Sequence, residues 1–309
     1  MVLTECRSLF LRINLILTIQ KFIDVLRRTG PPPMTNHISP PILLPRQSNG
    51  QHRVKHSSSI FCGAAALFFV APMHASAQTD EIQVYDARIA PVGTFNLTIH
   101  DNYIVSGSKT PAFPGGLIPD KSFNGVPEWA YGVTDWFEAG LYLPLYSITP
   151  SKGAELNGYK LRALFVEPDA ADKTFVYGIN FEFSFNSKHW DQDRYTSEIR
   201  PILGWHLGKM DLIFNPILDN SYHGIGGLDF APSTRLAYNF SSSWALAAEE
   251  YDDFGPLRRF YAPSKQTHQL FAVADYSGLP VDIEAGIGFG LTNATDDLTL
   301  KLIVSRDLN

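Results

Sequence analysis

The chain has 309 residues, a formal net charge of −6 and 13% aromatic residues. Its mildly acidic balance argues against a nucleic-acid partner, and its length allows one or two domains. All 13 Tyr and all 5 Trp follow Ala77, whereas Cys6 and Cys62 precede it. The downstream part therefore has no disulfide, thiol chemistry or cysteine-based metal site available to it.

The first 53 residues join an interrupted apolar stretch to three consecutive prolines, at positions 31–33, and a polar linker. The polar interruptions argue against a spanning helix, and the prolines argue against a folded domain. We interpret residues 1–53 as a disordered or non-native extension and expect translation to start near Val54.

Residues 54–77 have the three-part pattern of a cleaved signal peptide. Lys55 supplies a positive charge, an apolar run follows from Ile60 to Ala71, and Ala75-Ser76-Ala77 forms a small-residue cleavage site. The run is about a dozen residues, shorter than the roughly 20 that a spanning helix needs. We expect cleavage after Ala77; lipidation of Cys62 is the less favoured alternative, because a bulky residue precedes it.

Residues 78–309 show apolar residues at every second position in many segments, a period that predicts strands with one greasy face. From Val281 to Leu291 the apolar residues alternate with Asp, Glu and Gly, and from Phe175 to Asn186 five aromatic residues share one face with Ile179. About twelve strands are predicted. They are Phe95–Val105, Pro127–Val133, Phe137–Leu145, Tyr159–Phe165, Phe175–Asn186, Tyr195–Leu207, Met210–Leu218, Pro232–Phe240, Trp244–Glu250, Gln269–Tyr276, Val281–Leu291 and Leu298–Ser305.

Charged residues occupy the face opposite the greasy one in strand after strand. A water-filled lumen accommodates such charges, so the pattern favours an antiparallel transmembrane β-barrel over residues 78–309. A secreted soluble β-sandwich with a polar exterior is the alternative. The predicted lumen-lining residues are Glu138, Lys160, Arg162, Glu182, Glu198, Arg200, Arg235, Glu249, Asp282, Glu284 and Lys301. They either neutralise one another or form a constriction that selects solutes by charge.

Aromatic residues near predicted strand ends suggest girdles at the two boundaries between lipid and water. Packing in turns or in a core is the alternative. The candidates are Trp129, Tyr131, Trp136, Trp190, Tyr195 and Trp205.

The sequence holds no recognisable catalytic or metal-binding arrangement in residues 78–309. A hydrolase would need a serine beside a histidine that a third group orients; the candidates are His206, His223 and His268 with Ser197, Ser233 or Ser264. A calcium loop would need a regular series of oxygen ligands and a glycine turn, which the candidates His189, Asp191 and Asp193, or Asp252 and Asp253, lack. We therefore predict no enzyme activity, no metal and no cofactor.

Three segments resemble outer-membrane proteins of the phenol-degradation meta-pathway family. Val126–Pro144 resembles a hairpin of that family, and Val281–Thr292 and Asp296–Ile303 resemble its last two strands. The resemblance implies a bacterial outer-membrane barrel described as a channel or transporter, with uptake of hydrophobic or aromatic compounds inferred for some members. It supplies no catalytic residues.

The combined expectation is an outer-membrane channel for passive passage of small, hydrophobic or aromatic solutes. Outer-membrane lipids, lipopolysaccharide and the barrel-assembly machinery are the expected partners, besides the solute itself. An outer-membrane lipid-modifying hydrolase or acyltransferase, and a structural or adhesive barrel, are the alternatives.

Overall fold

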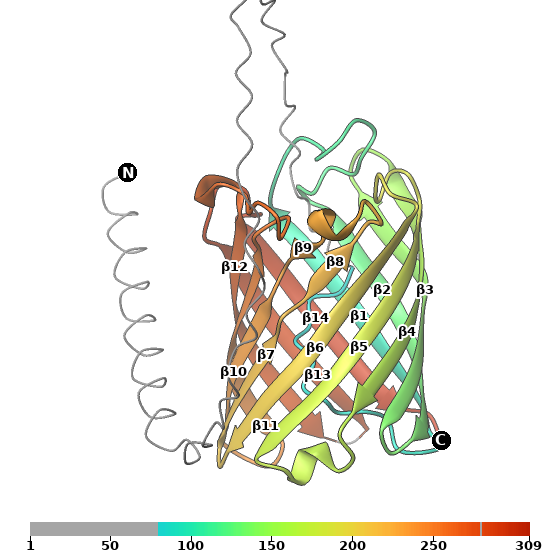
Figure 1. Cartoon of the computed structure of the whole chain (residues 1–309), viewed down its shortest axis with the longest axis vertical. Coiled ribbons are helices and arrows are strands. Elements are labelled where there is room, and N and C mark those ends of the chain that lie inside the picture. The colour runs from blue at the N-terminus through green and yellow to red at the C-terminus, as the bar shows by residue number, and fades with distance from the viewer. Residues whose placement is uncertain (1–79, 279) are drawn as a thin grey trace, which may run out of the picture. The chain divides into compact units, whose positions relative to one another are not determined.

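Antiparallel strands form one closed sheet in the computed structural model, which describes residues 80–278 and 280–309 (Figure 1). The predicted extension 1–53, signal peptide 54–77 and cleavage site lie outside the described residues. The strands are β1 (Phe95–Ser106), β2 (Phe123–Thr134), β3 (Phe137–Thr149), β4 (Gly153–Val166), β5 (Phe175–Asn186), β6 (Tyr195–Leu207), β7 (Met210–Asn215), β8 (Leu218–Asn220), β9 (Asp229–Phe230), β10 (Ser233–Asn239), β11 (Trp244–Asp253), β12 (Thr267–Gly278), β13 (Val281–Gly290) and β14 (Leu298–Asp307).

The sheet closes because β1 pairs with β14 at one seam and β5 pairs with β6 at the other. Two of the twelve positions around the barrel hold a broken strand. β8 continues β7 beyond Pro216, and β9 precedes β10 across Pro232. Proline has no N–H to donate to the ladder, which accounts for both interruptions. The predicted closed barrel of twelve antiparallel strands is confirmed.

The connections differ in length at the two ends of the barrel. At the end where β1 begins, residues 135–136 and 208–209 form two-residue turns; at the other end, the loops 107–122 and 254–266 are long. Bacterial barrels have short periplasmic turns and long extracellular loops, so we name the ends accordingly. The short helices are η1 (Ala170–Asp172) at the periplasmic end, and η2 (Ile225–Gly227) and η3 (Pro263–Lys265) at the extracellular end. Within the described ranges, no helix is both long and apolar enough to cross a bilayer.

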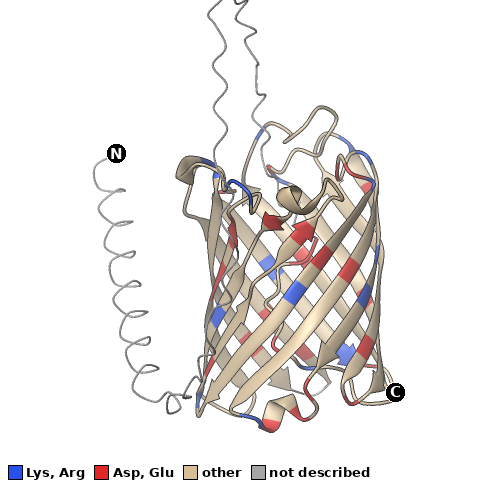
Figure 2. Cartoon of the chain, in the orientation of Figure 1, with Lys and Arg blue, Asp and Glu red and all other residues tan. Residues whose placement is uncertain are grey.

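The outer wall is apolar and the inner wall polar, as the alternation predicts. On β5, Phe181 and Phe183 are exposed, whereas Asn180 and Glu182 between and beside them are buried inside the barrel. Figure 2 shows charged residues both on the connecting loops and part-way along the strands. An outward apolar face with a polar interior is the distribution that lipid outside and water inside require.

The girdle prediction needs two corrections. Trp136 and Tyr195 are exposed at strand ends, as a girdle requires. Trp129 is exposed too, but it lies in the middle of β2 and not at its end. Trp190 has only 5% of its surface exposed. Its backbone N–H donates to the carbonyl of Ser187 within the extracellular loop 187–194. Trp190 therefore packs in the loop, and the girdle prediction is wrong for this residue.

The predicted apolar outer face of Phe137–Leu145 is wrong at its last residue, Leu145, which lies on the inner side. Leu145 is completely buried, against Val126 and Tyr142, because the register of β3 against β4 shifts between Tyr142 and Leu145. An extra residue on one strand reverses the alternation beyond it. The hydrogen-bonded strands also extend past the predicted bounds, as at Gly153, since sheet pairing continues where alternation has stopped.

Phe181 and Tyr177 provide a depth test on one strand and one face. Phe181 lies near the middle of β5, and Tyr177 lies near its periplasmic start. We predict that Phe181→Arg lowers the free energy of unfolding by about 2–4 kcal/mol and Tyr177→Arg by about 0–1 kcal/mol, because a cation at the bilayer midplane is poorly solvated. Equilibrium urea unfolding in lipid vesicles measures both; equal costs would contradict a lipid-covered wall.

Candidate functional site: the charged lumen

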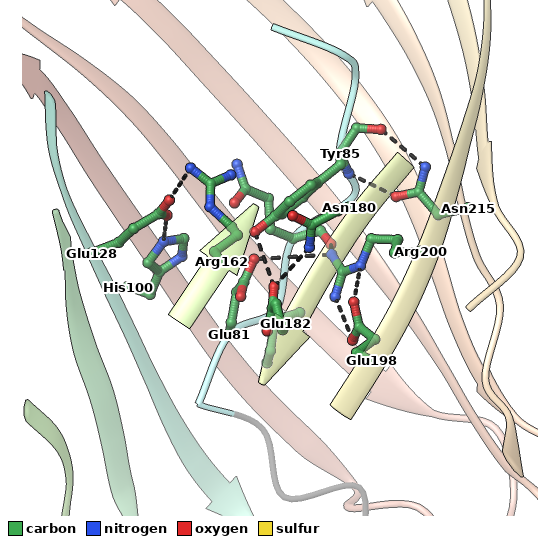
Figure 3. A network of polar contacts seen from close by, with 12 residues as sticks. Glu81, Tyr85, His100, Glu128, Arg162, Asn180, Glu182, Glu198, Arg200 and Asn215 are labelled. Carbon is green, nitrogen blue, oxygen red and sulfur yellow. Dashed lines mark hydrogen bonds and ion pairs between the residues drawn. The ribbon is translucent and has the colours of Figure 1, made fainter. Parts of the chain in front are cut away.

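A segment without regular secondary structure, residues 80–92, occupies the barrel interior; we call it the inner segment (Figure 3). Its side chains at Val84, Tyr85 and Ala87 are buried. They pack against apolar residues that point inward from the wall, namely Leu164, Val166, Val176, Ile202 and Ile213. The interior of the barrel is therefore partly filled by the chain that precedes β1.

Backbone groups of the inner segment have partners on the wall. Asn215 accepts from the N–H of Tyr85 at 2.7 Å and donates to its carbonyl at 3.0 Å. Arg200 donates to the carbonyl of Gln83 at 3.0 Å, and Lys301 donates to that of Ile82 at 3.2 Å. An unstructured chain inside a barrel must satisfy its amides in this way, because an unpaired buried peptide group is costly.

The first of three ionic clusters surrounds Arg162 on β4. Its guanidinium contacts Glu128 of β2 at 2.5 Å and also bonds Glu138 of β3. Glu128 in turn accepts from the His100 ring at 3.0 Å, and Glu138 accepts from the backbone N–H of Ala90. This cluster joins four wall strands, β1 to β4, to the end of the inner segment.

The second cluster joins two cations to four carboxylates. The Lys160 ammonium lies 2.6 Å from Asp80 and 3.3 Å from Glu182. Arg200 lies 2.6 Å from Glu198 and 3.9 Å from Glu81. The phenol of Tyr85 links the first two clusters. It contacts Tyr142 at 2.5 Å, whose ring centre lies 6.0 Å from the guanidinium carbon of Arg162, and it donates to Glu182 at 3.4 Å.

The third cluster lies on the opposite wall, on β10 to β14. Arg235 contacts Glu249 and Asp275, and reaches Glu284 at 3.4 Å. Lys301 bonds the same Glu249 and contacts Glu284 at 2.5 Å. Glu249 has no exposed surface. Its buried carboxylate is neutralised by two cations, Arg235 and Lys301.

Aromatic rings extend these clusters by lying against the cations. The guanidinium carbon of Arg200 is 4.4 Å from the centre of the Tyr85 ring, and that of Arg162 is 5.6 Å from it. The Lys301 ammonium lies 5.4 Å from the Phe271 ring centre. Such contacts stabilise partly desolvated cations by about 0.5–2 kcal/mol each.

The structure brings ten of the eleven predicted lumen residues into these clusters. The remaining one, Asp282, is exposed and lines a cavity of about 500 Å³ beside the inner segment. Lining residues such as Asn96, Ser242 and Asp307 come from the periplasmic ends of strands and turns, so the cavity lies in the periplasmic half of the lumen. Their part in passage of a solute stays a prediction.

The sequence did not predict the inner segment or three further ionisable residues of the inner wall. Residues 80–92 have no period that could reveal them. A signal for these three residues was present in the sequence. Each lies two or four positions from another inward residue of its own strand: His100 on β1, Glu128 on β2 and Asp275 on β12. Strict alternation along these strands could therefore have identified them.

The candidate catalytic histidines bond carboxylates instead of serines. His206 lies 2.6 Å from Asp211, His223 lies 3.1 Å from Asp193, and His268 contacts Asp252. Ser233 is almost fully buried and Ser197 accepts from Asn220. None of these pairs has the serine that the prediction required.

One serine, histidine and asparagine do meet, in and beside the loop 187–194. The His189 Nε2 atom lies 3.3 Å from Ser187 Oγ and 3.0 Å from Asn157 Oδ1. A catalytic histidine takes the proton of the serine at one ring nitrogen while the third residue holds the other nitrogen. Because both neighbours contact the same nitrogen here, this arrangement does not form that relay.

One group of residues in the described part of the chain has the spacing of a metal site. Potential ligand atoms of Glu250, Asp252 and His268 lie within 4.8 Å of one another. Asp252 and Asp253, considered as a calcium pair from the sequence, do not share a site, because successive residues of a strand point to opposite faces. Asp253 instead accepts from the N–H of Gly255.

Comparisons with solved structures find other barrels. An outer membrane channel from Pseudomonas putida F1 matches with a TM-score of 0.50 and 14% identity, over 74% of this chain and all of that one. The translocator domain of an autotransporter from Neisseria meningitidis has a TM-score of 0.40 and 13% identity, over 72% of this chain and 90% of that one. The outer membrane protein OprD from Pseudomonas aeruginosa has a TM-score of 0.32 and 13% identity, over 70% and 65%.

No protein-family model matches the chain, and no curated protein sequence matches it. At 14% identity, the likeness to the P. putida channel concerns the fold alone. The closed twelve-stranded sheet, apolar outer wall and charged interior define a transmembrane β-barrel of the bacterial outer-membrane type.

The buried pairing of Lys301 with Glu249 has a measurable consequence. We predict that Lys301→Met lowers the free energy of unfolding by about 3–5 kcal/mol, because it leaves a carboxylate without one of its two cations. Adding Glu249→Gln should recover part of the loss, because it removes the uncompensated charge. Urea unfolding of the three proteins measures this; a Lys301→Met protein as stable as the parent would contradict the cluster.

Proposed function

We propose that the protein is a passive channel for small solutes across the bacterial outer membrane. The observation that carries the proposal is the cavity of about 500 Å³ inside a closed barrel, with charged and polar residues along it. Water and small solutes can occupy such a space, and the polar groups that line it can solvate them. The similar fold of a protein named as an outer membrane channel supports the same role.

The inner segment would set the width of the pathway. It fills part of the lumen, and its bonds to Asn215, Arg200 and Lys301 hold it against the wall. We therefore expect a small single-channel conductance while the inner segment is bound to the wall, and a larger one when its hydrogen bonds are weakened.

The class of solute remains a proposal. The family resemblance favours hydrophobic or aromatic compounds, and the apolar Val84, Leu164 and Ile303 contribute to the cavity. The many carboxylates along the same cavity favour hydrophilic ones. Swelling of protein-containing liposomes in isosmotic solutions of neutral sugars, amino acids and phenols would rank these classes.

Lipid-modifying activity is the rival function, and the contact of Ser187 with His189 is the observation that favours testing it. Labelling with a fluorophosphonate would detect an activated serine. We propose no catalytic role for Ser187, since the serine and the asparagine contact the same ring nitrogen of His189, whereas a relay needs one partner at each nitrogen.

The proposed partners follow from the barrel. Outer-membrane lipids and lipopolysaccharide would contact the outer wall, and the barrel-assembly machinery would insert the protein into the membrane.

Thiol blocking tests whether the cavity conducts. We predict that a bulky water-soluble methanethiosulfonate reduces the current of Ser242→Cys, which lines the cavity, in a background with Cys6 and Cys62 replaced by Ser. Leu246→Cys is the control, because Leu246 is exposed on the outer wall, where lipid shields it from the reagent. Planar-bilayer recordings measure the current; refolded protein without conductance would overturn the proposal.

Tyr85→Ala tests the inner segment. It removes the phenol contacts to Tyr142 and Glu182 and the ring beside Arg200, so we predict a larger or flickering single-channel conductance. Tyr177→Ala, on the outer wall, should leave conductance unchanged. Identical recordings from the two variants would show that the segment does not limit passage.

A further inference from the structure

We propose that the lumen selects for small cations, inorganic or organic ammonium, over anions. The inference rests on the proposed channel function and adds its charge selectivity. It comes from three observations, which share some of their residues: the balance of the ionic clusters, the lining of the cavity and an acidic group nearer the extracellular end.

The three ionic clusters contain more carboxylates than cations. Arg162, Lys160, Arg200, Arg235 and Lys301 are five cations, and they contact nine different carboxylates. The formal balance is −4 with His100 neutral. Since each cation contacts at least two carboxylates, the positive charges are already neutralised and offer little attraction to an anion.

Glu81 is a buried carboxylate without a hydrogen bond. It has 2% of its side-chain surface exposed, and neither carboxylate oxygen has a hydrogen-bond partner; its contact with Arg200 is long, at 3.9 Å. Figure 3 shows it on the inner segment beside Glu182. A buried carboxylate with free acceptor atoms is a favourable place for a cation to enter.

The cavity itself has the same sign. Seven carboxylates and three guanidinium groups line it. Four of these carboxylates and two of the guanidinium groups are already counted in the clusters, so the cavity adds a formal charge of −2 from Asp86, Asp282, Asp307 and Arg88. Asp86 is paired with Arg88 at 2.7 Å, whereas Asp282 and Asp307 are exposed at the periplasmic mouth. An acidic mouth with low-dielectric walls concentrates cations and repels anions before they reach the clusters.

A third acidic group lies toward the extracellular end. Asp219 is opposite Asp229 across β8 and β9, and also opposite Glu198, so these side chains share the inner face. In residues 80–278 and 280–309, no salt bridge to a lysine or arginine joins Asp219, Asp229 or Asp253. One oxygen of Asp229 is buried without a hydrogen-bond partner. A permeating cation would therefore meet excess negative charge along the whole lumen.

The reversal potential of the full refolded chain in a potassium chloride gradient tests the inference. We expect the sign for potassium permeation, with a preference over chloride on the order of tenfold at low salt. The preference should shrink in 1 M salt, where the screening length is about 3 Å. A reversal potential at zero or of the chloride sign would overturn the selectivity, while absent conductance would overturn the channel role itself.

Variants locate the selectivity. Asp282→Asn with Asp307→Asn should shift the reversal potential toward zero, and Ser242→Lys with Ser243→Lys should shift it further in the same direction. Asp135→Asn with Asp172→Asn is the matched control: it removes the same charge from periplasmic turns that do not line the cavity. Equal shifts in cavity and control variants would contradict the assignment. Heat-modifiable gel migration confirms that each variant folds.

Discussion

The backbone inside a bilayer has no water to bond, and this constraint determines the architecture of the chain. Every strand must find partners on both sides, which only a closed sheet provides. The pairing of β1 with β14 supplies the last of these bonds. Once the sheet is closed, the two faces of each strand meet different solvents, and the alternation of residues such as Phe181 and Glu182 follows from that difference.

Closure of the sheet also brings the charged side chains of the inner face close together. Charged side chains on the inner face are confined to a narrow space, where an unpaired charge is costly. Cross-wall contacts such as Arg162 with Glu128, and the carbonyl contacts of Lys301 and Arg200 with the inner segment, neutralise most of them. The clusters therefore both brace the wall and hold the inner segment, so stability and pore width depend on the same residues.

The sequence predicted the closed barrel and its inner face because a period of two covers most of the length of the strands that contact both lipid and lumen. It failed where this period is broken, as at Leu145, where an extra residue reverses the alternation, and at Trp190, where a loop covers the ring. The inner segment could not be predicted, since its place depends on bonds such as that of Tyr85 with Asn215, 130 positions apart. The ion pairs between distant charged residues could not be predicted either, since they form only once the sheet is closed.

Quenching of tryptophan fluorescence by lipids brominated on their acyl chains tests most directly whether hydrocarbon covers the outer wall. Single-tryptophan proteins that retain Trp129 or Trp190 would be compared in vesicles. Trp129 is 44% exposed in the middle of β2, so it should be strongly quenched, whereas Trp190, buried in an extracellular loop, should not be. Equal quenching of the two, or none at Trp129, would contradict a lipid-covered barrel.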